Sequence, residues 1–205
     1  MNESEKVVAH QILSKGFKQV VDTFSDISQH EVLINSLDIQ QVEGVCTQGL
    51  KLEKAGKIFL LTTEVVGDVA AKSYLSFEAA EVDALVRMCL PSLDPNNQDK
   101  NMAHAMLLEL DNMLSANVVT HIANSLGVKI FGDVPTLQET TAQQVIEEVA
   151  QAFSTPANDQ QAQKFLLVKV EFSMTNRANF QPVFIWKFTH QFFQAISDYV
   201  KQTAL

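Results

Sequence analysis

Two polar residues three positions apart, Glu109 and Asn112, stand in the middle of a long helical pattern. Residues at this spacing are neighbours on a helix surface, so the carboxylate and the amide would project side by side. An amide offers a donor and an acceptor in one plane and can hold a water molecule without being titrated. The small residues Ala105 and Ala116 flank the pair and would let the surface of another molecule approach closely. Taken alone, such a pair is more often simply a solvated helix face.

The helix expected to position this pair covers residues 102–126. Its apolar residues fall together on one face, wide enough to pack on a core: Met106, Leu110, Met113, Leu114 and Val118. The Glu109–Asn112 pair lies roughly 130° from the centre of that face. Gly127 is suited to end the helix. Residues 128–131 then favour a strand, which Pro135 is expected to stop.

The remaining pattern alternates helices with strands and contains two strong hairpins. Further helices are predicted at residues 4–24, 142–153 and 189–203, with Ser4 and Thr140 as N-caps of the first two. Another helix is predicted after Ser76 as its N-cap, with an apolar face that includes Ala79 and Cys89 and an end at Leu90 and Pro91. Strands are predicted at residues 32–42, 45–52, 57–66, 69–77, 164–174 and 180–188, because these stretches are rich in β-branched and aromatic residues or alternate in polarity. Polar loops are predicted at residues 92–100 and 154–161.

One order of elements occurs twice along the chain. Residues 1–91 and 100–205 each give a long helix, a strand, a hairpin and a closing helix, with one extra helix in the second half. This repeat predicts a single α+β domain over residues 1–205, with a mostly antiparallel sheet and long helices packed on it. Coincidence is the alternative, because nothing repeats at the level of residues.

Composition narrows the classes of function. The chain has 205 residues and a net charge of −9, which argues against nucleic acid as a partner. Cys46 and Cys89 have no CxxC spacing, and the five histidines have no spacing typical of metal ligands, so no metal site is predicted. The N-terminus does not resemble a signal peptide, and no apolar run approaches the roughly 18 residues of a membrane span. A cytoplasmic protein without a membrane span is expected.

The spacing around the pair resembles a motif of the CheC, CheX and FliY family of chemotaxis phosphatases. That motif has Asp or Ser, three residues, Glu, two residues, Asn, twenty-two residues and Pro; Glu109, Asn112 and Pro135 match it. The flanking text ELDNMLSANVVTHIANSLG is also similar to the family's helix. Three positions depart from it: Ala105 replaces Asp or Ser, and Asp111 and Ala116 replace common glycines. The helix at residues 4–24 carries no second pair, as in CheX.

The resemblance implies a pseudo-twofold fold and a phosphatase acting on the aspartyl-phosphate of a CheY-type response regulator. Asn112 would orient the attacking water, Glu109 would bind the active-site lysine of the regulator, and Pro135 would be structural. No cofactor of its own is implied, because the receiver domain of the regulator supplies Mg²⁺.

Two alternatives stay open at this point. Ala105 and Asp111 favour a catalytically degenerate module of the same fold, which would bind a response regulator, a CheD-like partner or a flagellar-switch protein. The other alternative is a homodimer built by pairing of edge strands, with the Glu109–Asn112 pair incidental.

Overall fold

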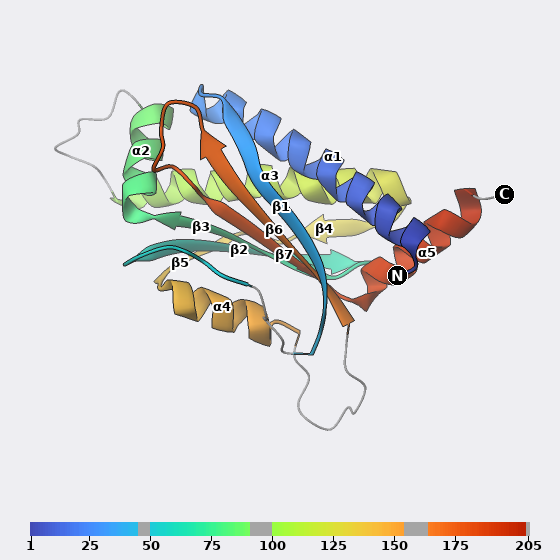
Figure 1. The fold of residues 1–205 in the computed structure, drawn as a ribbon. Coiled ribbons are helices and arrows are strands. Elements are labelled where there is room, and N and C mark those ends of the chain that lie inside the picture. Colours follow the sequence, from blue (N-terminus) through green and yellow to red (C-terminus); the bar gives the residue numbers. More distant parts are fainter. Residues whose placement is uncertain (45–49, 91–99, 154–163, 204–205) are drawn as a thin grey trace.

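The computed structural model describes residues 1–44, 50–90, 100–153 and 164–203 (Figure 1). Its elements are, in chain order, α1 (Glu3–Ser28), β1 (Val32–Glu43), β2 (Ile58–Gly67), β3 (Ala71–Glu78), α2 (Ala79–Cys89), α3 (Lys100–Leu126), β4 (Ile130–Gly132), β5 (Thr136–Thr140), α4 (Ala142–Gln151), β6 (Lys164–Met174), β7 (Val183–Phe188) and α5 (His190–Thr203). Among these residues no helix combines the length and the apolar character needed to cross a membrane.

The seven strands form one sheet in which all neighbours are antiparallel. Their order is β1-β6-β7-β3-β2-β4, and β5 also pairs with β2. The two predicted hairpins, β2–β3 and β6–β7, meet at the centre through the pairing of β3 with β7. Each hairpin is flanked by strands from the other half of the chain, since β1 lies beside β6 while β4 and β5 lie beside β2. Exchanging the two halves leaves this order unchanged, so the predicted α+β class and pseudo-twofold arrangement are confirmed.

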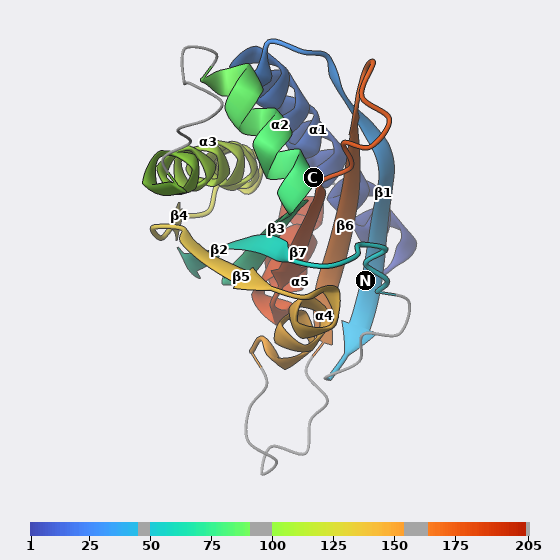
Figure 2. The same cartoon turned by 90° about the vertical axis from the view of Figure 1, so that its left-hand side faces the viewer.

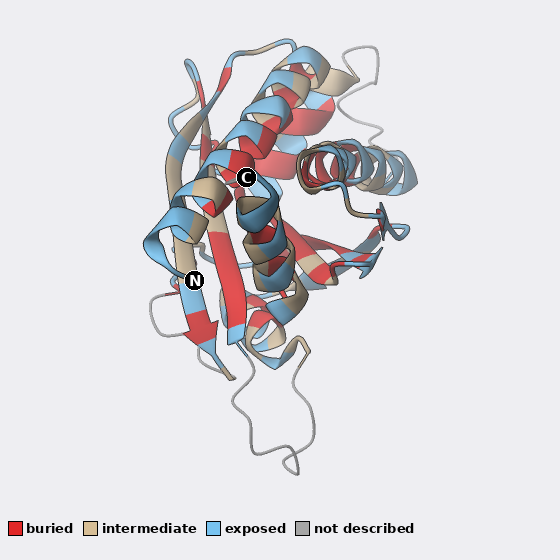
Figure 3. Cartoon of the chain, turned by 90° about the vertical axis from the view of Figure 1, so that its right-hand side faces the viewer, coloured by how far each residue is buried: buried red, intermediate tan, exposed pale blue. Residues whose placement is uncertain are grey.

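Helices cover both faces of the sheet. The long helices α1 and α3 lie on one face, and α4 lies on the other (Figures 1 and 2). Alternate residues of a strand point to opposite faces. Accordingly, Leu61 and Leu75 belong to the large core under α1 and α3, whereas Leu60 and Tyr74 belong to a smaller core under α4. The helices show buried residues toward the sheet and exposed residues on their outer sides (Figure 3).

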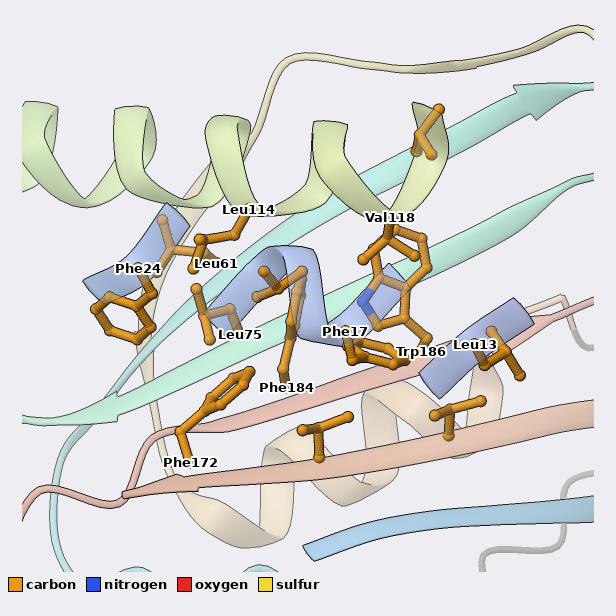
Figure 4. Packing of buried hydrophobic residues seen from close by; sticks show 14 of the residues in the cluster. Leu13, Phe17, Phe24, Leu61, Leu75, Leu114, Val118, Phe172, Phe184 and Trp186 are labelled. Atoms are coloured by element: carbon orange, nitrogen blue, oxygen red, sulfur yellow. The ribbon is translucent and has the colours of Figure 1, made fainter. Parts of the chain in front are cut away.

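The large core is dominated by aromatic and branched side chains. Phe17 of α1 meets Phe184 of β7 edge to face, with ring centroids 6.2 Å apart, and Leu114 and Val118 of α3 point into the same layer (Figure 4). Burying one such side chain stabilises the fold by about 1.5–3 kcal/mol. Trp186 is also fully buried in this layer. The core therefore fixes α3 firmly against the sheet.

The N-caps predicted at Ser4, Ser76 and Thr140 are wrong, although the helix predicted from Ala142 begins there. The structure places the N-caps at Asn2, Glu78 and Thr141. In each case the side chain three positions further on accepts a hydrogen bond from the backbone N–H of the N-cap residue, and this bond distinguishes the start from adjacent polar residues. Ser76 instead lies within β3, where its hydroxyl donates to the Val183 carbonyl at 3.2 Å.

Other predicted elements differ at their limits. The first helix continues to Ser28, past its predicted end, and Gln29 then adopts a left-handed conformation. Of the predicted strand at 45–52, residues 50–52 form no strand, and the remainder lies outside the described residues. The predicted loops at 92–100 and 154–161 also lie outside them, except for Lys100, which begins α3. Strand β5 was not predicted, because its sequence TLQET has no apolar alternation.

Candidate functional site

The helix that carries the candidate pair is rotated relative to the sequence prediction. Met113, expected on the apolar face, is 41% exposed. The buried line of α3 instead consists of Leu107, Leu110, Asp111, Leu114, Ser115, Val118, Val119 and Ile122. The helix packs on α1 as well as on the sheet. The buried surface of α3 therefore faces both α1 and the sheet, and it includes the polar residues Asp111 and Ser115, which the predicted apolar face did not contain.

The pair itself faces outward. Glu109 and Asn112 are exposed, and so are the flanking residues Ala105 and Ala116. Neither the carboxylate of Glu109 nor the amide of Asn112 makes a hydrogen bond or an ion pair with another described residue. The helix therefore points both side chains outward, and their donors and acceptors can all bond to solvent or to a partner molecule.

A depression of about 360 Å³ brings this pair together with a distant segment of the chain. It is lined by Ala105, Leu108, Glu109 and Asn112 of α3, and by Gly132, Asp133, Val134 and Pro135 between β4 and β5. Pro135 thus lies beside the pair, whereas Ala116 does not line the depression. One wall is helical and the other is a loop at the edge of the sheet.

The loop wall is held in place by strand β2. The backbone N–H of Asp133 donates to the Glu64 carbonyl at 2.8 Å, between the pairing of β2 with β4 and its pairing with β5. Gly67 lets β4 approach, because a Cβ there would lie 2.2 Å from the carbonyl oxygen of Lys129. Sequence reasoning missed Asp133 and Val134 as parts of the wall, although their position directly before Pro135 was a usable signal.

The depression carries negative charge. Glu109 and Asp133 line it together, and no lysine or arginine of the described residues does so. Val134 beside them is 80% exposed, and Phe131 on the adjoining strand is 65% exposed. Two carboxylates with apolar neighbours suit a partner that brings a cation within an otherwise apolar contact surface.

Asp111 is buried on the inner side of α3. Its Oδ2 accepts a hydrogen bond from the Thr63 hydroxyl at 2.6 Å, and its Oδ1 has no partner among the described residues. Burial raises the pKa of Asp111 to about 6, opposed by the hydroxyls of Thr63 and Ser115, which lower it. The signal for this burial was its place one turn after Leu107 and three residues before Leu114, on the core-facing line.

Two buried lysine side chains have their hydrogen-bonding partners within the fold. Lys54 pairs with Glu81 at 2.6 Å beside a separate cavity of about 370 Å³. Lys187 donates to the carbonyls of Val149, Ala150 and Ala152 at the end of α4, at 2.8–3.1 Å. In the described part of the chain, no group of three or more His, Cys, Asp or Glu side chains is arranged to hold a metal ion.

Comparison with known proteins finds similarity in structure only. No family model and no curated protein matches the sequence. The crystal structure of Thermotoga maritima FliY superposes with a TM-score of 0.68 at 12% identity, covering 98% of each chain. CheX from Desulfovibrio desulfuricans gives 0.53 at 11% identity, covering 87% of this chain and 97% of that one. The middle domain of Helicobacter pylori FliM gives 0.57 at 9% identity, covering 97% and 99%. The chain therefore has the fold of the CheC, CheX and FliY proteins, which the FliM middle domain shares.

Proposed function

We propose that this protein hydrolyses the aspartyl-phosphate of a CheY-type response regulator. The observation that carries the proposal is the depression, in which Glu109 and Asn112 are exposed, unpaired with other described residues and adjacent to Pro135. These are the three residues that match the motif of the CheC, CheX and FliY phosphatases. The likeness in fold to FliY and CheX supports the same reading.

The proposed chemistry needs positioning more than a reactive side chain. Phosphoryl transfer depends on an in-line nucleophile and on stabilised charge, and the receiver domain holds the Mg²⁺ that neutralises the phosphoryl oxygens. The Asn112 amide oxygen would accept a hydrogen bond from the attacking water, and its NH₂ group would donate to a phosphoryl oxygen. Water forms the new O–P bond as the bond from phosphorus to the aspartyl oxygen breaks. The products are inorganic phosphate, which retains the proton of the water or releases it to solvent, and the free carboxylate of the regulator.

Glu109 has a docking role in this proposal. Its carboxylate would pair with the active-site lysine of the regulator, one turn of helix before the amide, and so fix which face of α3 meets the phosphoryl group. Asp133 adds a second negative charge on the opposite wall. The exposed side chains of Val134 and Phe131 would pack against the surface around that lysine.

Phosphate release from a panel of phosphorylated receiver domains tests the proposal. The wild-type protein should accelerate release from at least one of them. Asn112→Ala should lower the maximal rate by about a hundredfold or more, since an unheld water loses its in-line geometry. Glu109→Ala should chiefly raise the receiver concentration at half-maximal rate. Asn124→Ala, an exposed asparagine of the same helix outside the depression, is the matched control and should leave both parameters unchanged.

A binding module without turnover is the second candidate. It is favoured by Ala105, which lacks the hydrogen-bonding group of the family's Asp or Ser, and by the likeness in fold to the FliM middle domain. Receiver binding by calorimetry with no phosphate release would support this candidate and refute the first. Gain of turnover in Ala105→Asp would then identify residue 105 as the cause of the lost activity.

A further inference from the structure

The two walls of the depression come from segments that touch the same residue of β2. Strand β2 pairs with β4 at Val65 and Gly132 and with β5 at Thr62 and Thr136, so Thr63 and Glu64 lie opposite the loop between them. A Cβ placed on Gly132 would lie 3.7 Å from the methyl group of Thr63. The side chain of Thr63 is therefore next to the loop wall.

The same side chain also holds the helical wall. The Thr63 hydroxyl donates to Asp111 at 2.6 Å in a fully buried contact, and Asp111 directly precedes Asn112 in α3. A second contact, between the hydroxyls of Ser73 and Ser115 at 3.3 Å, lies one turn further along the helix. Hydrogen bonds to a carboxylate are short, directional and about twice as strong as neutral ones. The Asp111–Thr63 bond therefore fixes the helix at the level of the candidate pair.

We propose that Asp111 is a positioning residue for this depression, setting through Thr63 the separation between the helix face that carries Asn112 and the loop of Asp133–Pro135. The proposal deepens the proposed function and rests on it only for the consequence that this separation controls access of the phosphoryl group. Asp111 does not line the depression and touches no substrate. Its effect on the site passes through the hydroxyl of Thr63.

The contact responds to pH because the carboxyl group is buried. Burial is the main cause that moves the pKa of Asp111 to about 6, and only hydroxyl groups oppose it. The elements that contact α3, and α3 itself, carry these charged or titratable side chains: Glu3, Glu5, Lys6, His10, Lys15, Lys18, Asp22 and Asp26 on α1; Glu64 on β2; Lys72, Tyr74 and Glu78 on β3; Glu81, Asp83, Arg87 and Cys89 on α2; Lys100, His104, Glu109 and His121 on α3; Asp133 in the loop; Glu139 on β5; and His190, Asp198, Tyr199 and Lys201 on α5. None of them contributes to the shift of Asp111. Below pH 6 the bond to Thr63 becomes a neutral one and weakens, so the walls are tied more tightly above that pH.

Nuclear magnetic resonance of the full chain tests this coupling without requiring any activity. The backbone amides of Gly132, Asp133 and Val134 and the side-chain amide of Asn112 are followed from pH 5 to pH 8. Both walls should report one shared midpoint near pH 6 in the wild type. Asp111→Asn should abolish that midpoint on both walls. A midpoint that survives in this variant comes from another group and overturns the proposal.

Substitution of Thr63 tests whether the protonation of Asp111 reaches the loop through the Thr63 side chain. Thr63→Val keeps the shape of the side chain and removes the donor, so the loop should lose its response to pH. Thr63→Ser keeps the donor to Asp111 but removes the methyl group that faces Gly132, so the side-chain amide of Asn112 should keep its midpoint while the loop loses it. A loop that responds to pH as in the wild type in either variant contradicts the proposal.

If Thr63→Val does not fold, the comparison of wild type with Thr63→Ser and Asp111→Asn still decides the matter. Failure of the proposed phosphatase function can be distinguished from failure of the positioning role of Asp111. A shared midpoint with no phosphate release removes the phosphatase and leaves the positioning role, and phosphate release without a shared midpoint does the reverse.

Discussion

Replacing Asp111 by asparagine should change the pH dependence of stability by a predictable amount. The carboxyl group has a pKa of about 6 in the fold against an ordinary value of 3.8, because it is buried between α3 and the sheet. Each pKa unit corresponds to about 1.4 kcal/mol, so this difference of roughly two units is worth about 3 kcal/mol. Asparagine keeps an oxygen that accepts from the Thr63 hydroxyl but has no titrating proton.

The direction in which stability changes with pH follows from proton binding by Asp111. Between pH 3.8 and about 6 the folded protein holds a proton on Asp111 that the unfolded chain has released. This group therefore stabilises the fold fully below pH 3.8, and its contribution is lost as the pH rises through about 6. Relative to the wild type, Asp111→Asn should gain about 3 kcal/mol across that window, more than half of it between pH 4 and pH 7. Any constant cost of placing an amide at this position cancels in the difference between two pH values.

Urea unfolding of both proteins at about pH 4 and about pH 7.5 measures this difference. Asp83→Asn on α2 removes an exposed carboxylate and serves as the matched control, which should follow the wild type at both pH values. If the free energies of unfolding of the wild type and Asp111→Asn differ by the same amount at both pH values, Asp111 does not titrate in the window, and the argument from burial is refuted.

Three further substitutions test how the fold supports the site. Lys187→Met removes the ammonium group that donates to three carbonyls at the end of α4 and should cost about 2–4 kcal/mol in urea unfolding; equal stability would mean that these bonds contribute nothing net. Gly67→Ala places a Cβ 2.2 Å from the carbonyl oxygen of Lys129 at a φ of 122°, so the midpoint of thermal unfolding should fall and amide exchange in β4 should accelerate; unchanged values would contradict the close approach. Asn2→Ala removes the capping bond to Glu5 and should cost about 1 kcal/mol, and no loss would place the start of α1 elsewhere.

The sheet could be predicted where the local signal was strong. The stretches that became β2, β3, β6 and β7 are rich in β-branched and aromatic residues, and β6 begins and ends where expected. Strand β5 has no such signal, since it exists because the exposed edge of β2 offers it backbone partners. Its pairing links residues more than seventy positions apart, which no local pattern contains.

The part of the candidate site that depends on local spacing could be predicted, and the part that depends on distant partners could not. The exposure of Glu109 and Asn112 follows from helical spacing, and the structure agrees with it. The burial of Asp111 does not follow from helical spacing, because an acidic residue is expected to face solvent unless its buried partner is known. That partner, Thr63, lies 48 residues away on β2. Asp133 and Val134 likewise join the depression only because β2 holds their loop beside α3.

In the proposed function, the Asn112 amide positions the water that attacks an aspartyl-phosphate. The most direct measurement is the rate of phosphate release from a phosphorylated receiver domain with saturating protein, comparing wild type, Asn112→Ala and the control Asn124→Ala. We predict acceleration by the wild type and by Asn124→Ala and its loss, by about a hundredfold or more, in Asn112→Ala. Equal acceleration by all three proteins would contradict the claim, because the water would then be held by another group.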